Sequence, residues 1–286
     1  MSNTKRKRRF TLVGRALTLA GTLALGVASG LLAHDFWVVP MQFSSAPGAM
    51  IEFHGQTSSR FPTSQSAVAV ERVAEARMLG SGDEERITDL SIAGQSLVLK
   101  HAPRTAGQRV VAVVLQPTSR RQAVAGLKRY IGLEGAPELA EALEAQGAFA
   151  GFDSANMKTQ KFAKSIVEIG QRGPRAFSRT AGHGLEIVPL SDPGALHPGG
   201  QLAVRLLFRG APVPGAYLRA GTAPDSAGAT SAKPDTVLVT NSEGVATLTV
   251  RAGLWNVRSL HAAPLPSTRT DWDVYFGTLV FRVAGH

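Results

Sequence analysis

Short apolar runs separated by turn residues repeat along most of this chain, and they limit the folds it can adopt. In the first half these runs are residues 36–39, 50–53, 74–79, 96–99 and 109–115. In the second half they are residues 185–190, 201–208, 236–240, 245–250, 255–261 and 277–283. Runs of this length, bounded by Gly, Pro, Asn, Asp and Ser, are typical of β-strands. We therefore predict a mainly β protein of two antiparallel β-sandwich domains, residues 34–183 and 184–286.

The pattern changes between residues 120 and 170, where Ala, Leu, Glu, Lys and Arg are frequent. Apolar residues three and four positions apart predict helices over 121–131 and 137–149, the second starting at a proline. Residues 157–169 suggest a third helix that tightens into a strand at 165–169. We expect a short helical insertion packed on the first sandwich, followed by a linker over 171–183. The insertion carries four glutamates that we expect to face solvent: Glu134, Glu138, Glu141 and Glu144.

The first 33 residues have the pattern of a secretory signal. Residues 1–9 are polar and basic, and residues 16–33 are apolar or small and carry no charge. We predict a signal peptide cleaved after Ala33 and export to the periplasm. An uncleaved segment acting as a membrane anchor is the alternative. The pair Arg8-Arg9 resembles a twin-arginine signal only weakly, because Thr11 replaces an apolar residue, so general secretion is favoured.

Charge and cysteine content exclude several classes of function. Six of the 31 Lys and Arg residues lie in the leader and none of the 21 Asp and Glu residues does, which leaves a net charge of +4 on residues 34–286. That small excess, without a basic run interleaved with aromatic residues, argues against nucleic-acid binding. The chain has no cysteine. Metal ligands are therefore expected among His, Asp, Glu and backbone groups.

His34 is the strongest candidate for a metal ligand. After cleavage it is the first residue, and its α-amine and imidazole both lose a proton near neutral pH and chelate one ion. Two nitrogens leave the ion under-coordinated, so further ligands are needed. Asp35 is adjacent, and His54 and His261 each fall near the end of a predicted strand. The alternative is that these are a strand-anchoring terminus and two histidines at the rim of a sandwich.

No enzyme motif occurs in the chain. Gly-x-Ser-x-Gly, the phosphate-binding Gly-x-x-x-x-Gly-Lys-Ser/Thr pattern and His-x-x-x-His spacing are all absent from the sequence. We therefore predict that the protein is not an enzyme.

Five segments together resemble a family of periplasmic proteins grouped as a domain of unknown function. They are HDFWVVP (34–40), LEIVPLSDPGALHPGGQLAVRLLFRGAPVPGA (185–216), TNSEGVATLTV (240–250), GLWNVRSLH (253–261) and DWDVYFGTLVF (271–281). The resemblance implies a second sandwich similar to the transthyretin-like regulatory domains of carboxypeptidases. Some members are assigned to nickel or cobalt uptake systems, and histidines often stand at the positions of His54 and His261.

Two functions remain open. The first is a periplasmic metal-binding accessory protein for nickel or cobalt, with copper as the alternative ion, that delivers its ion to a membrane importer. The second is a metal-free interaction module that binds an envelope protein or a glycan through the loops 55–70 and 221–234.

Overall fold

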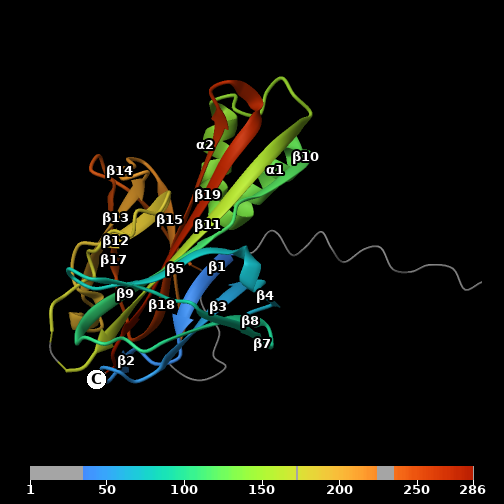
Figure 1. Cartoon of the computed structure of the whole chain (residues 1–286). Helices are drawn as coiled ribbons and strands as arrows, with labels where there is room; N and C mark the ends of the chain where they lie inside the picture. The colour runs from blue at the N-terminus through green and yellow to red at the C-terminus, as the bar shows by residue number, and fades with distance from the viewer. Residues whose placement is uncertain (1–34, 172, 224–234, 286) are drawn as a thin grey trace, which may run out of the picture. The chain divides into compact units, whose positions relative to one another are not determined.

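The computed structural model describes residues 35–171, 173–223 and 235–285 (Figure 1). The chain divides into two units, residues 1–32 and 33–286, and all described residues belong to the second. The predicted signal peptide, residues 1–33, lies outside the described residues.

Three sheets form the described part of the chain. The five-stranded sheet contains β1 (Asp35–Pro40), β3 (Ile51–Ser58), β4 (Ser66–Ala67), β7 (Asp89–Ala93) and β8 (Ser96–His101). The ten-stranded sheet contains β2 (Ser44–Ser45), β5 (Val73–Leu79), β6 (Glu84–Arg86), β9 (Gly107–Leu115), β10 (Thr118–Ala123), β11 (Ser154–Ile169), β15 (Tyr217–Ala223), β16 (Thr236–Val239), β18 (Gly253–Leu265) and β19 (Thr268–Val283). The four-stranded sheet contains β12 (Leu185–Pro189), β13 (Gln201–Phe208), β14 (Ala211–Pro212) and β17 (Val245–Thr249).

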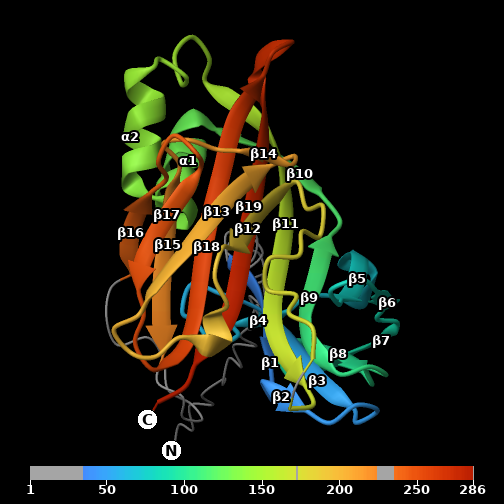
Figure 2. The same ribbon diagram turned by 90° about the vertical axis from the view of Figure 1, so that its left-hand side faces the viewer.

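The ten-stranded sheet is apolar on both faces, and each of the other sheets packs on one face. On β9, Val111 and Val113 join a core with β1, β3 and β8, whereas Val110 and Ala112 join a core with β12, β13 and β17. Successive residues of a strand point to opposite faces, so this alternation places one sandwich on each side (Figure 2). The predicted β-sandwich architecture is confirmed.

The two sandwiches share strands, which the sequence did not indicate. The predicted boundary at residue 183 falls between β11 and β12, yet β11 pairs with β19 in the ten-stranded sheet. This pairing is parallel, from Asn156–Asp271 to Ser165–Val280, so the sheets are not purely antiparallel. The described residues between β11 and β12 contain no helix or strand, in agreement with the predicted linker.

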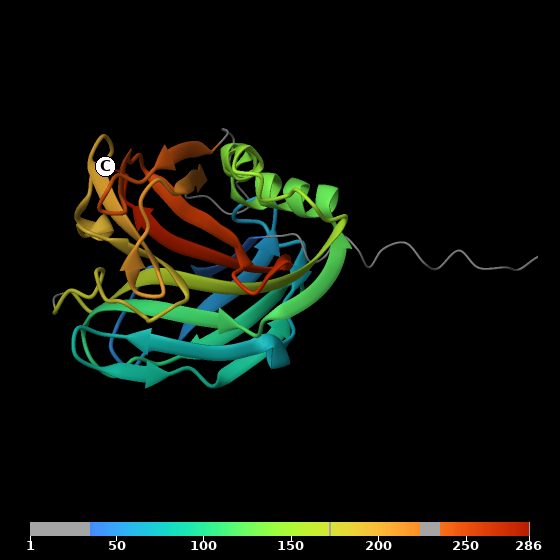
Figure 3. The ribbon, with the colours of Figure 1, turned by 90° about the horizontal axis from the view of Figure 1, so that it is seen from above.

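The helical insertion is shorter than predicted. It consists of α1 (Val124–Tyr130), the π-helical turn η2 (Ile131–Gly135) and α2 (Pro137–Ala145); the remaining helical turns, η1 (Val70–Arg72) and η3 (Pro193–Ala195), lie elsewhere. The helix predicted from residue 157 is wrong, because these residues belong to the long strand β11, whose last residues are the strand predicted at 165–169. Leu127, Ile131 and Ala140 pack on β11, β18 and β19, beyond the end of the five-stranded sheet (Figures 1 and 3).

Within the described ranges, no helix has the length and apolar character needed to cross a membrane.

Candidate functional site

Asp35 is the first described residue of β1, and His34, which precedes it, lies outside the described residues. The strand alternates, so Phe36 and Val38 face the core of the five-stranded sheet while Trp37 faces the opposite side. Asp35 shares the side of Trp37 and is almost fully buried. Its Oδ2 lies 2.9 Å from Nε of Arg258 on β18, and the two groups form an ion pair. The carboxylate is therefore held by a charged partner at the junction between β1 and the ten-stranded sheet.

Glu134 of the π-helical turn meets the same carboxyl group. Its side chain is hydrogen-bonded to that of Asp35, and it is buried, whereas Glu138 and Glu141 are exposed as predicted. Burial raises the pKa of Glu134 to about 8, and the nearby charge of Asp35 adds to this increase. Burial also raises the pKa of Asp35, although Arg258 opposes the change. Two carboxyl groups that share a hydrogen bond in a buried site hold a proton between them near neutral pH.

Three more charged residues, Lys161, Arg219 and Asp235, lie beside these groups. We name the whole set the buried ionic cluster; its members are Asp35, Glu134, Lys161, Arg219, Asp235 and Arg258. Lys161 of β11 interacts electrostatically with both acidic side chains, and its burial lowers its pKa. Asp235 accepts from Nη2 of Arg258 at 2.5 Å and lies 3.4 Å from Nη2 of Arg219. The cluster thus joins β1, the helical insertion, β11, β15 and β18.

His54 is on β3, on the same side of the five-stranded sheet as Asp35 but far along it. Asp35 pairs with Ser58, whereas His54 pairs with Val39, so four residue steps separate them. At about 3.4 Å per residue this is roughly 13 Å. Nε2 of His54 lies 2.6 Å from Oε1 of Glu52.

His261 is on β18, three residues after Arg258. Because side chains alternate along a strand, the two residues point to opposite faces of the ten-stranded sheet. The imidazole stacks on Phe208 of β13, with ring centroids 4.1 Å apart. Burial, with the neighbouring Arg209, lowers its pKa. His261 is thus packed within the second sandwich.

The structure therefore does not bring Asp35, His54 and His261 together. Over residues 35–171, 173–223 and 235–285, no three His, Asp or Glu side chains are grouped so as to hold a metal ion. The residue that sequence reasoning missed beside Asp35 is Glu134. No local sequence pattern marked it, because the π-helical turn that buries Glu134 with Ile131 and Gly135 has no simple sequence signal.

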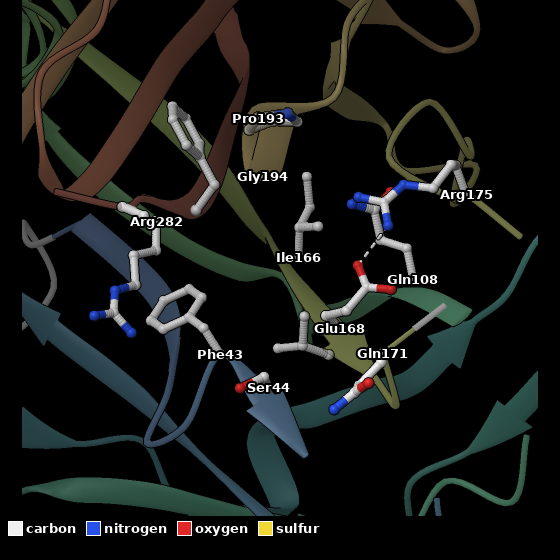
Figure 4. Close-up of a pocket in the computed structure, with 13 residues that line it drawn as sticks. Phe43, Ser44, Gln108, Ile166, Glu168, Gln171, Arg175, Pro193, Gly194 and Arg282 are labelled. Carbon is white, nitrogen blue, oxygen red and sulfur yellow. Dashed lines mark hydrogen bonds and ion pairs between the residues drawn. The ribbon is translucent and has the colours of Figure 1, made fainter. Parts of the chain in front are cut away.

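A second feature is an open cleft of about 470 Å³ where β11 and β19 stop pairing. Figure 4 shows Phe43 on one side and the ion-paired Glu168 and Arg175 on the other. Arg175 donates to Glu168 at 2.6 Å and is also paired with Asp192. An apolar floor with a charged rim is typical of sites for small ligands or chain ends.

The chain belongs to the family described as Domain of unknown function (DUF4198), whose model matches residues 31–263. The description assigns no activity to the family, and no curated protein matches the chain.

Solved structures similar to this chain are distant. The D0-D1 domain of intimin shares 10% identity over 86% of this chain and 97% of its own, with a TM-score of 0.20. Escherichia coli alpha-2-macroglobulin activated by porcine elastase shares 8% identity over 88% of this chain and 20% of its own, with a TM-score of 0.25. A DUF4785 family protein from Legionella pneumophila shares 9% identity over 77% of this chain and 51% of its own, with a TM-score of 0.24.

Proposed function

We propose that this protein is a periplasmic, non-enzymatic metal-binding accessory protein that uses the mature N-terminus to carry nickel or cobalt to a membrane importer. Copper is the alternative ion. The observation that carries the proposal is the pairing of Asp35, the neighbour of His34, with the buried carboxyl group of Glu134.

The donor set suits these ions. The Cα atom of residue 34 is one peptide unit, about 3.8 Å, from that of Asp35. The α-amine and imidazole of His34 would supply two nitrogens, and the two carboxyl groups would supply oxygens once the ion displaces the proton they share, a mixture that Ni²⁺, Co²⁺ and Cu²⁺ accept. The carboxylate of Asp35 forms an ion pair with Arg258 and a hydrogen bond with Glu134, and because each of its oxygens has two lone pairs, acceptor capacity remains for an ion.

The match to the family model begins at residue 31 and so includes the proposed new terminus. In this proposal Arg258 and Lys161 act as the outer groups that orient and neutralise the carboxylates. His54 and His261 are not ligands of this ion.

Calorimetric titration of the mature protein with Ni²⁺, Co²⁺ and Cu²⁺ tests the proposal, after mass spectrometry has verified that the exported form begins at His34. We expect one ion per chain. His34→Ala, or one residue added before His34, is expected to weaken binding at least tenfold, and Glu134→Gln about tenfold or more. Glu138→Gln, on the exposed face of α2, is the matched control and should bind as the wild type does.

Equal affinity in all these proteins would refute the proposal and leave the metal-free interaction module. A terminus other than His34 would refute the role of its amine.

A further inference from the structure

Both surface methionines of the described chain lie at one corner of the five-stranded sheet. Met41 and Met50 are 56% and 57% exposed, whereas Met78 and Met157 are buried in the cores at 1% and 2%. Exposing a large apolar side chain twice at one place needs a reason, since neither contributes to a core.

The strand register groups these thioethers with His54. Met41 follows β1 and its backbone N–H donates to the carbonyl oxygen of Glu52 at 2.9 Å, so it stands opposite Glu52. On β3, Glu52 and His54 are two positions apart and share one side of the sheet, and Met50, just before the strand, stands two positions before Glu52. Met41 is thus diagonal to both Met50 and His54, at the 7–8 Å separation that long side chains bridge. Methionine is unbranched and flexible, which lets its sulfur turn toward the imidazole.

His54 is held in the orientation of a ligand. Its Nε2 lies 2.6 Å from Oε1 of Glu52. An ionised carboxylate only accepts, so in the neutral ring Nε2 carries the proton and Nδ1 keeps its lone pair. A carboxylate that accepts from one ring nitrogen while the other binds a metal is a recurrent arrangement in metal sites.

We propose that Met41, Met50 and His54 form a second, surface site for a soft monovalent ion, Cu⁺ or Ag⁺. Thioethers select such ions over Ni²⁺ or Co²⁺. The local charge also favours a monovalent ion. Nζ of Lys100 lies 3.5 Å from Oε2 of Glu52, and its positive charge would repel a divalent ion more than a monovalent one. The site does not depend on the N-terminal one, from which roughly 13 Å of strand separates His54.

Titration with Ag⁺, in a His34→Ala background that removes the N-terminal imidazole, tests this site. We expect a 1:1 complex, and shifts of the methyl NMR signals of Met41 and Met50 but not of the buried Met78 and Met157. The double variant Met41→Leu, Met50→Leu keeps the shape but not the sulfur, and His54→Asn removes the imidazole. Each should weaken Ag⁺ binding at least tenfold.

His101→Asn is the matched control. Nε2 of His101 lies 3.1 Å from Oε2 of Glu85, a similar histidine–carboxylate contact on β8, and this variant should bind Ag⁺ unchanged. Unshifted Met41 and Met50 methyl signals, or full affinity in the leucine double variant, would overturn the proposal. Nickel binding by that double variant with His34 intact reports separately on the N-terminal site.

Discussion

Replacing Lys164 by Met is expected to destabilise the protein by about 3–5 kcal/mol, the cost of leaving one member of a buried ion pair without its partner. Nζ of Lys164 lies 2.7 Å from Oε1 of Glu186, and the two side chains are 1% and 2% exposed. The lysine is on β11, facing the four-stranded sheet, so the pair links the two halves of the chain.

Methionine fills a similar volume, so the loss comes from the charge rather than from a cavity. Glu186 also accepts backbone N–H groups of Ala181, Gly182 and His183, at 2.6, 3.1 and 3.2 Å. These bonds keep the carboxylate in place after the substitution, where it remains buried without a cation.

Urea unfolding followed by fluorescence measures the free energy of unfolding, provided that the slope with urea is the same in all proteins. Lys128→Met is the matched control, since Lys128 pairs with Glu144 at the surface, with side chains 39% and 56% exposed. Such a pair contributes about 1 kcal/mol at most. A loss for Lys164→Met as small as that for Lys128→Met would refute the reasoning.

Two further predictions concern the cores. Burial lowers the pKa of His183 to about 3, below its ordinary value, so the folded state keeps the ring neutral. The neutral His183 ring contributes fully to stability above about pH 6.5, and this contribution declines as the pH falls toward 3. Between pH 7 and pH 5 we expect this decline to lower the free energy of unfolding by about 2 kcal/mol. The difference in unfolding free energy between wild type and His183→Asn isolates this effect from other titrating groups, and an identical pH dependence in the two proteins would contradict it. Trp272 is 1% exposed and stacks on Phe149, with ring centroids 5.3 Å apart. Trp272→Ala should therefore destabilise the protein by about 3–5 kcal/mol and make the helical insertion the first site of limited proteolysis. An unchanged cleavage pattern would show that this contact does not hold the insertion in place.

Most strands could be predicted because apolar alternation and turn residues act locally. The first part of β11 could not be predicted, since Lys158, Lys161 and Lys164 recur every three residues and imitate the polar face of a helix. In the structure Lys161 and Lys164 point to opposite faces of one strand, and each meets buried carboxyl groups. Tertiary ion pairs, which no local pattern reveals, make both positions compatible with a strand.

The candidate site was predictable only in part. Asp35 was identified from its place after the predicted cleavage point, but Glu134 was assigned to solvent because its spacing matched that of exposed helical glutamates. The π-helical turn rotates it inward, and such a turn has no simple sequence signal. His54 and His261 were expected at strand ends, but both lie within longer strands, β3 and β18, and whether they meet depends on register and on which face each side chain takes.

We propose that the mature N-terminus holds the ion beside Asp35 and Glu134. Paramagnetic shifts in the amide NMR spectrum of the mature protein with one equivalent of Co²⁺ locate the ion in solution. We expect the largest shifts at Asp35, Phe36, Glu134 and Gly135, and small ones around His54 and His261. Shifts centred on either of those histidines, or no shift in the buried ionic cluster, would contradict it.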